Sequence, residues 1–170
     1  MNIVAAPPPQ AVGGPWHTGG DFLSFRLGAE EYGIDILRVR EIRSYETPTR
    51  VAHLPAALKG VVNLRGVIVP LVDLRMLLGC EHCEYDTLTA VVMLNLGGRT
   101  VGAVVDSVCD VLALGPTMIE SPAGHGHLTA RGRVGEFVAG IGQFADRSLL
   151  LLDIDALMAH VDAGMATAQG

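Results

Sequence analysis

An internal repeat constrains this 170-residue chain more than any other feature of its sequence. Repeats of this kind decide a fold because each copy forms the same supersecondary unit. A shift of 69 positions places the first half of the chain on similar residues of the second: Leu27-Gly28 on Leu96-Gly97, Gly33 on Gly102, Ile36 on Val105, Val39 on Val108, Glu41 on Asp110 and Ile42 on Val111.

The later part of each copy matches at a different spacing. A shift of 80 positions places Gly60 on Gly140, Leu71-Val72-Asp73-Leu74 on Leu151-Leu152-Asp153-Ile154, and Leu77-Leu78 on Leu157-Met158. The change in spacing implies an insertion of 11 residues in the second copy, within 115–135. We infer two copies of a unit of about 70 residues. A unit this small buries a thin core, so we expect the copies to pack together, with a groove for a partner between them.

The residue pattern within each copy predicts strands with a few short helices. Runs rich in β-branched and aromatic residues, bounded by Gly, indicate strands at 22–27, 32–36, 61–72 with a turn at Arg65-Gly66, 89–96, 100–105 and 138–152. Asp73 and Asp153 each precede a short apolar helical run and are typical N-caps. The chain is therefore predicted to be mainly β.

The two ends differ from the rest of the chain. Residues 1–20 carry Pro and Gly without hydrophobic periodicity, which predicts a disordered N-terminal arm. Residues 161–170 are small and polar toward the end and are expected to form a frayed C-terminal tail. The folded part is then 21–160, divided into one unit at 21–83 and a second at 84–160. Exchange of strands between the units stays open.

Composition excludes several classes of function. The net charge of −6 argues against a protein that binds nucleic acid by neutralising phosphates. No run reaches the ~18 apolar residues of a membrane span, and the first 20 residues lack the basic start of a signal peptide. A soluble cytoplasmic protein is expected. With 49% hydrophobic and only 18% charged residues, exposed apolar patches and protein partners are expected as well.

Signals for catalysis or cofactor binding are weak. The chain contains no nucleophile elbow, P-loop, HExxH motif or dinucleotide fingerprint, so no enzyme activity and no cofactor are expected. Cys80 and Cys83 form a CxxC, and His125 and His127 could complete four zinc ligands. Their separation of about 40 residues matches no standard zinc finger. We therefore interpret them as an incidental loop, with no metal bound.

The repeat also separates structural from functional candidates, because a residue needed by the fold recurs in both copies. Glu41 becomes Asp110, so a structural and a functional role are both open. Arg65 becomes Ala145, so the fold does not require an arginine there. It can pair with Glu41 or reach a partner. Arg38, Arg40 and Arg43 likewise have no basic counterparts, which indicates a solvated edge or guidance of an acidic partner.

Several of these segments resemble a known family. The runs EEYGIDI (30–36), VREI (39–42) and above all KGVVNLRGVIVPLVDLR (59–75) resemble CheW, the family of bacterial chemotaxis coupling proteins. The match continues through 104–108 and 138–142 and covers about 21–160. The same module ends the histidine kinase CheA and begins the adaptor CheV. This chain has no room for a kinase or receiver domain, so a free-standing coupling protein fits best.

The resemblance implies both a fold and a role. The fold would be two small five-stranded SH3-like β-barrels related by an approximate two-fold axis. The role would be that of a non-enzymatic adaptor in chemosensory arrays. One surface would bind the cytoplasmic tip of a chemoreceptor, a helical hairpin, and another the regulatory domain of the histidine kinase CheA. The protein would be cytoplasmic and recruited to membrane-associated receptor arrays, without inserting into the membrane.

The resemblance also implies site residues. Val39, Glu41 and Ile42 match the receptor-facing segment of the family, and Arg65 matches the arginine of its NLRG motif, implicated in coupling to receptor and kinase. The kinase contact of the family lies mainly on the second barrel, and the resemblance does not identify its single residues in this sequence. The alternative class is a β-barrel protein that binds a small ligand or a metal, which requires the Cys/His cluster to matter.

Overall fold

The computed structural model describes residues 19–79, 83–122 and 134–169, without the side chains of 134–135 and 164–169. Most of the predicted arm therefore lies outside the described residues. The elements follow one another in this order: β1 (Gly20–Leu27), β2 (Glu30–Asp35), η2 (Ile36–Arg38), β3 (Val39–Ser44), β4 (Leu58–Leu64), β5 (Val67–Asp73), α1 (Leu74–Leu77), β6 (Ala90–Leu96), β7 (Arg99–Val105), β8 (Ser107–Leu114), η3 (Pro116–Met118), β9 (Ile119–Glu120), α3 (Val134–Phe137), β10 (Val138–Phe144), β11 (Arg147–Leu152) and α4 (Ile154–Gln169).

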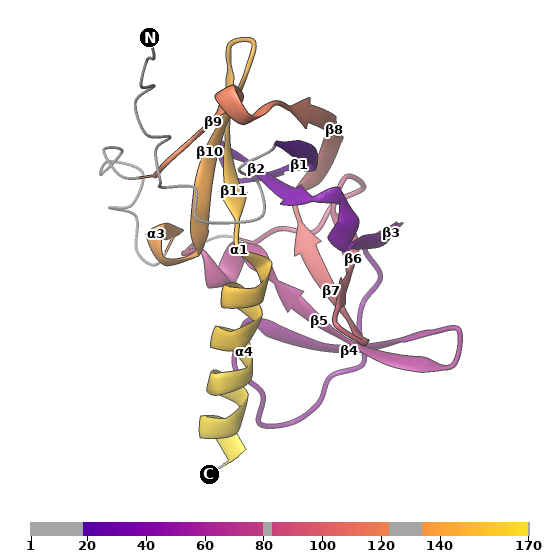
Figure 1. Ribbon diagram of the computed structural model, residues 1–170. Helices are drawn as coiled ribbons and strands as arrows, with labels where there is room; N and C mark the ends of the chain where they lie inside the picture. Colours follow the sequence, from indigo (N-terminus) through magenta and orange to yellow (C-terminus); the bar gives the residue numbers. More distant parts are fainter. Residues whose placement is uncertain (1–18, 80–82, 123–133, 170) are drawn as a thin grey trace, which may run out of the picture.

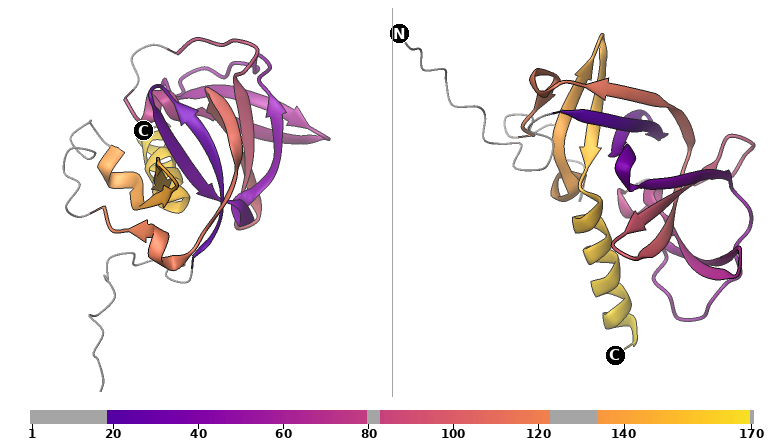
Figure 2. Two further views of the ribbon diagram at one scale, coloured as in Figure 1. Left: turned by 90° about the horizontal axis from the view of Figure 1, so that it is seen from above. Right: turned by 45° about the vertical axis from the view of Figure 1, so that its right-hand side comes forward.

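These strands form two curled sheets that lie against each other (Figures 1 and 2). Sheet A has the order β8-β1-β2-β11-β10-β9, and sheet B has the order β3-β6-β7-β5-β4. The hairpin β1–β2 of the first copy thus lies among strands of the second, and the hairpin β6–β7 of the second lies among strands of the first. The exchange of strands that the sequence left open is present.

The two sheets are equivalent strand by strand. In each of them the exchanged hairpin joins its neighbour by parallel pairing, β2 with β11 and β7 with β5. The pairing places Gly33 opposite Leu151 and Gly102 opposite Leu71, which is the correspondence that the two shifts predict. A Cβ on Gly102 would lie 2.4 Å from Leu71 Cδ2, and one on Gly33 would lie 2.9 Å from Leu151 Cδ2. The recurring glycines therefore permit close packing at this junction.

Sheet A has six strands and sheet B has five, but the additional strand of sheet A is only two residues long. In sheet A the two-residue strand β9 pairs with β10, where Glu120 lies opposite Ile141. In sheet B the equivalent contact is an isolated bridge between Thr49 and Val61, 80 positions before Ile141. Each sheet thus contains the same arrangement, and the predicted class is confirmed: a mainly β protein with two SH3-like units.

Three hydrophobic clusters hold the fold together. The largest takes residues from both sheets, among them Phe25 of β1 and Val92 of β6, together with Leu157 of α4. Two smaller clusters lie within single sheets, around Leu149 in sheet A and around Val69 in sheet B. Leu149 and Val69 are equivalent under the second shift. One copy alone would bury only a thin core, and the central cluster shared by both sheets adds the buried apolar surface that a single copy lacks.

Both predicted N-caps are present. The Asp73 carboxylate accepts a hydrogen bond from the Arg75 N–H at 3.0 Å at the start of α1, and the Asp153 carboxylate accepts one from the Ala156 N–H at 3.0 Å at the start of α4. Helix α4 continues to Gln169, through most of the segment assigned to a tail. Its run of Ala, Met and Val without Pro is compatible with a helix, and its first turns pack on the central cluster.

The sequence pattern did not predict β3 and β8. In β3 every second residue is exposed, and three of its six residues are charged, so its composition is atypical of a strand. Antiparallel pairing with β6, and of β8 with β1, is what makes these segments strands.

A buried arginine connects α1 to the chain after β7. Arg75 has 1% of its side chain exposed and donates two hydrogen bonds to Asp73, at 2.9 and 2.8 Å, and one to Asp106 at 2.9 Å. Its guanidinium lies 4.8 Å from the centre of the Tyr85 ring. Burial and the Asp73 carboxylate raise the pKa of Tyr85, so the phenol keeps its proton and donates to Asp73 at 3.1 Å.

We expect Arg75→Ala to lower the free energy of unfolding by about 3–5 kcal/mol, because it leaves the carboxylate of Asp73 buried without its counter-charge. Arg99→Ala is the matched control, since Arg99 pairs with Asp162 at a half-exposed position, 49% on each side. That pair should contribute less than about 1 kcal/mol. Urea unfolding followed by circular dichroism measures both. Equal, small losses for the two variants would contradict the structural role of Arg75.

Candidate partner-binding site

The segment with Val39, Glu41 and Ile42 is strand β3, which lies at one end of the strand order of sheet B. Its pairing with β6 shifts between Val39 and Glu41. This bulge places Val39 opposite Leu94 and Ile42 opposite Val92, on the face of the central cluster. Glu41 lies opposite Met93 and shares the other face. The three predicted residues are thus neighbours in sequence but divide between two faces of the sheet.

Their exposure differs accordingly. Ile42 is 46% exposed, whereas Val39 packs partly against the central cluster. The Glu41 side chain is 26% exposed. Of the three, Ile42 presents the apolar surface and Glu41 the charge.

Arg65 lies in the two-residue turn between β4 and β5. Arg65 and Gly66 both have positive φ, +54° and +89°, as a tight hairpin turn of this length requires. The Asn63 side chain closes the turn by accepting a hydrogen bond from the Gly66 N–H at 2.7 Å. Ala145 has φ of +55° at the equivalent turn of the second copy. The backbone conformation is therefore common to both copies, while the arginine is not.

The guanidinium of Arg65 donates two hydrogen bonds to the carboxylate of Glu41. Nη1 donates to Oε2 at 2.8 Å and Nη2 to Oε1 at 3.5 Å. Because β3 and β4 stand at opposite ends of the strand order, this ion pair joins the two ends of the curled sheet. We call it the clasp. The Arg65 side chain is 75% exposed, so water screens the pair and its contribution to stability is small.

The second copy has an acid in the equivalent place and another arginine. Asp110 of β8 is bound by Arg147 of β11 at 3.0 Å, and Arg147 also binds Glu31 of β2. Hydrogen bonds from Arg147 lower the pKa of Glu31, against the opposing effect of burial. They also lower the pKa of Asp110. The recurring acid is thus paired in both copies, which keeps a structural role for Glu41 beside a functional one.

The three arginines around Glu41 have contacts within the chain. Arg38 pairs with Asp155 at the start of α4, and Arg40 donates to the Thr100 hydroxyl at 3.0 Å. Arg43 Nε lies 4.0 Å from Glu41 Oε1. Part of their charge is thus balanced locally. Among these four arginines, Arg65 is the one presented at the tip of a hairpin.

Three of the four Cys and His residues weighed as zinc ligands lie outside the part of the chain that the structure describes. Cys80, His125 and His127 lie outside the described residues, and Cys83 is half-buried. Within 19–79, 83–122 and 134–169, no group of three or more His, Cys, Asp or Glu side chains could hold a metal ion.

The described helices include none with the length and apolar character that crossing a bilayer requires.

Sequence reasoning missed one further place with functional potential. Arg50 and Lys59 line a pocket below the loop between β3 and β4. Lys59 corresponds to Ala139 under the shift of 80. The bridge Thr49–Val61 is equivalent to the pair Glu120–Ile141. Arg50 follows Thr49 as Ser121 follows Glu120, so Ser121 is the counterpart of Arg50. The same comparison of copies that singled out Arg65 would have found Lys59, whereas the counterpart of Arg50 follows only from the pairing of the strands.

Comparison with known proteins agrees with this architecture. A family model described as the CheW-like domain matches residues 21–162. The chemotaxis protein CheW of Klebsiella aerogenes is 48% identical over 147 residues, 86% of each chain. The CheW of Rhizobium meliloti is 30% identical over 139 residues, 82% of this chain and 87% of the relative.

A solved structure shows the same fold. The crystal structure of a scaffolding protein, CheW of Thermoanaerobacter tengcongensis, superposes with a TM-score of 0.71 at 27% identity. The match covers 79% of this chain and 89% of that chain. Sequence, pairing of the strands and overall architecture agree, and the chain belongs to the CheW-like family of chemotaxis scaffold proteins.

Proposed function

We propose that this protein is a non-enzymatic adaptor that couples chemoreceptors to the histidine kinase CheA, so that receptors control the activity of the kinase. The observation that carries the proposal is the clasp. Arg65 is held at an exposed hairpin tip by a weak ion pair, in a turn whose backbone recurs in the second copy without the arginine. A residue that the fold does not require, and that is presented in this way, is available to a partner.

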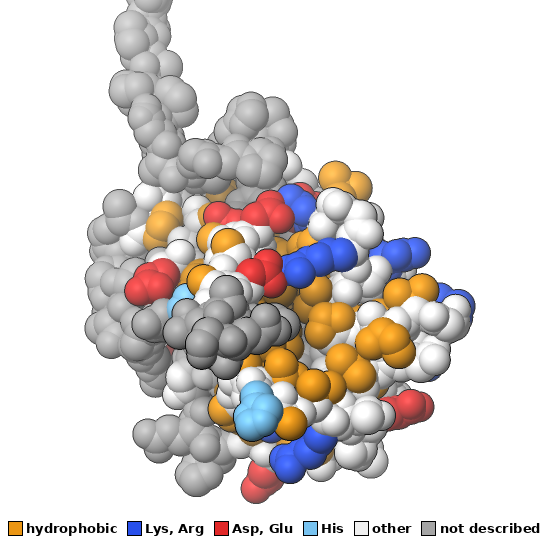
Figure 3. Space-filling model, turned by 90° about the horizontal axis from the view of Figure 1, so that it is seen from below, with side chains coloured by type: hydrophobic (Ala, Val, Ile, Leu, Met, Phe, Trp, Pro, Cys, Tyr) orange, Lys and Arg blue, Asp and Glu red, His pale blue; other side chains and the backbone are white. Residues whose placement is uncertain are grey.

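Exposed apolar side chains support a partner of matching character. Several large ones are more than one-third exposed: Leu37, Ile42, Val51, Val67, Ile68, Tyr85, Leu88 and Val111. Figure 3 shows one face on which hydrophobic side chains gather, with both basic and acidic side chains along its margin. A helix with an apolar face and charged flanks fits such a surface, which is how the receptor tip would bind.

The kinase would bind through its regulatory domain, on a surface separate from that of the receptor. Two partners on one scaffold permit assembly into arrays, with the protein cytoplasmic and recruited to receptors at the membrane. Signalling would then be a shift in the population of complex states, since a bound receptor changes kinase activity only by binding two states with different affinity.

Reconstitution tests the proposal directly. A receptor signalling fragment and the kinase are combined with and without this protein, and phosphorylation of the kinase is measured. We expect the receptor fragment to control phosphorylation only when the protein is present. A kinase that responds equally in its absence would contradict the proposal.

We expect Arg65→Glu to abolish receptor-dependent activation of the kinase in this assay, because it reverses the charge offered to the partner and repels Glu41. The fold should remain, since the exposed pair contributes less than about 1 kcal/mol. Arg26→Glu, at an exposed position of β1, is the matched control. The double variant Glu41→Arg with Arg65→Glu restores the pair in reverse. If the double variant recovers activation, the ion pair itself is what matters, and a partner does not contact Arg65 directly.

We expect Glu41→Ala to weaken binding of the receptor fragment several-fold to tens-fold, on the order of 1–2 kcal/mol, because it frees Arg65 from its position and removes a charged contact. Titration calorimetry measures the affinity. Asp110→Ala, the equivalent change in the second copy, should leave receptor affinity unchanged. A collapse of the melting temperature in Glu41→Ala with unchanged affinity would assign Glu41 a purely structural role.

A further inference from the structure

A second candidate site lies under the loop that connects β3 to β4. The loop and the start of β4 enclose a pocket of about 490 Å³, a volume within the usual range for ligand sites. The lining comes from one short part of the chain, residues 50–56 together with 58–59. Its residues do not include Glu41 or Arg65, so the pocket is separate from the clasp.

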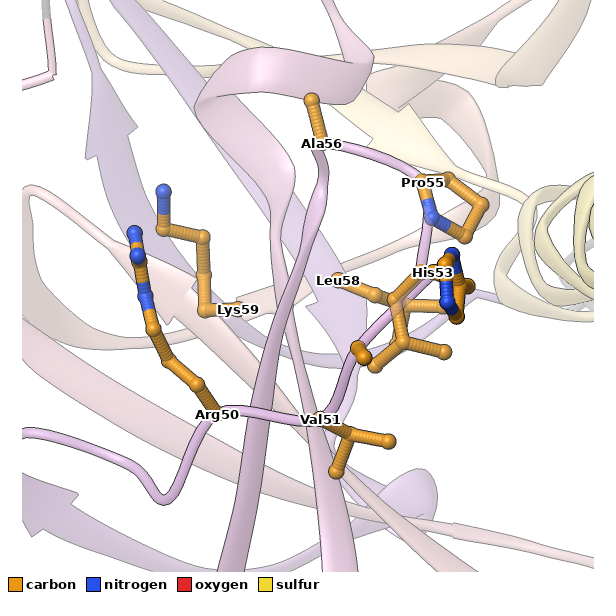
Figure 4. A pocket seen from close by; sticks show the side chains of 9 residues that line it. Arg50, Val51, His53, Pro55, Ala56, Leu58 and Lys59 are labelled. Carbon is orange, nitrogen blue, oxygen red and sulfur yellow. The ribbon is translucent and has the colours of Figure 1, made fainter.

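One side of the pocket is cationic, and the other is apolar apart from His53. Figure 4 shows the side chains of Arg50 and Lys59 together on one side and those of Val51, His53 and Pro55 on the other. The described lining contains no Asp or Glu, although the chain as a whole carries a net charge of −6. A local concentration of positive charge on an acidic protein attracts carboxylates.

The described residues position the backbone of both cations and place no acid against either side chain. The bridge between Thr49 and Val61, with hydrogen bonds of 2.8 and 2.9 Å, fixes Arg50 beside the start of β4. It requires Gly60, because a Cβ there would lie 2.2 Å from the Thr49 carbonyl oxygen. The Lys59 ammonium lies 6.0 Å from the centre of the Tyr85 ring and 3.6 Å from Met76 Sδ, neither of which carries a negative charge.

The comparison of copies argues against a structural need for these charges. Ser121 and Ala139 occupy the equivalent positions around the corresponding bridge in sheet A. The fold therefore forms this corner without a cation. Arg50 is exposed, and no ion pair joins it or Lys59 to an acid among the described residues.

We propose that this pocket binds a short acidic segment of a partner protein. A carboxylate of the segment would lie between Arg50 and Lys59, as charge-assisted hydrogen bonds favour. A neighbouring apolar side chain would cover Val51 and Pro55. A small inorganic anion would leave that apolar side uncovered, which is why a peptide is the better match. The proposal does not depend on the coupling function, because its test uses the isolated chain.

The test is a titration of the full-length ¹⁵N-labelled protein, followed by NMR, with the capped tetrapeptide Glu-Leu-Phe-Glu. We expect amide shifts confined to residues 50–59. The matched peptide Gln-Leu-Phe-Gln should bind at least about tenfold more weakly, since it lacks the charges. Equal binding of the two peptides, or shifts centred elsewhere, would overturn the proposal.

Variants and other anions complete the test. Arg50→Gln and Lys59→Gln should each weaken binding of the acidic peptide several-fold, whereas Arg26→Gln should leave it unchanged. Arg50→Gln is the safer of the two, because its side chain is exposed and its loss does not disturb the fold. Inorganic phosphate that binds as tightly as the peptide would overturn the proposal, and so would phosphatidylglycerol vesicles that bind when the peptide does not.

Discussion

Parallel pairing between strands of different copies holds together each of the two sheets of this protein. Where β2 meets β11 and where β7 meets β5, a hairpin from one copy completes the sheet of the other. Gly33 and Gly102 favour both junctions, because a Cβ at either position would force a leucine of the partner strand to shift. Neither copy can therefore finish its sheet alone, and the large central cluster forms only when both are present.

The same duplication explains how one scaffold can carry different surfaces. The backbone of the turn at Arg65 recurs at Ala145, and the bridge at Thr49 recurs at Glu120. Side chains at these equivalent positions are free to differ, since the backbone is determined by pairing and turn geometry. The first copy carries the arginine of the clasp and the cations of the pocket, whereas the second carries neither. The two copies thus share a backbone but carry different side chains, so that their surfaces differ in chemistry.

Predictions from the sequence succeeded where the signal is local. The N-caps at Asp73 and Asp153 and the turn at Arg65-Gly66 depend on residues a few positions apart, and all are present. The strand β3 was not predicted, because three of its six residues are charged and its sequence does not resemble a strand. It forms a strand because it pairs with β6. The burial of Arg75 could not be predicted either, since its partner Asp106 lies 31 positions away and an arginine is usually exposed.

The twofold repeat of strands is evident from the order of residues alone, because each matching glycine, turn and cap depends on residues a few positions apart. It also marked Arg65 as dispensable to the fold. The exchange of hairpins between the copies, and the contact of Arg65 with Glu41 across 24 positions of sequence, became visible in the folded protein. Such contacts depend on how the sheets curl and pack, and no local pattern of residues specifies this property of the whole chain.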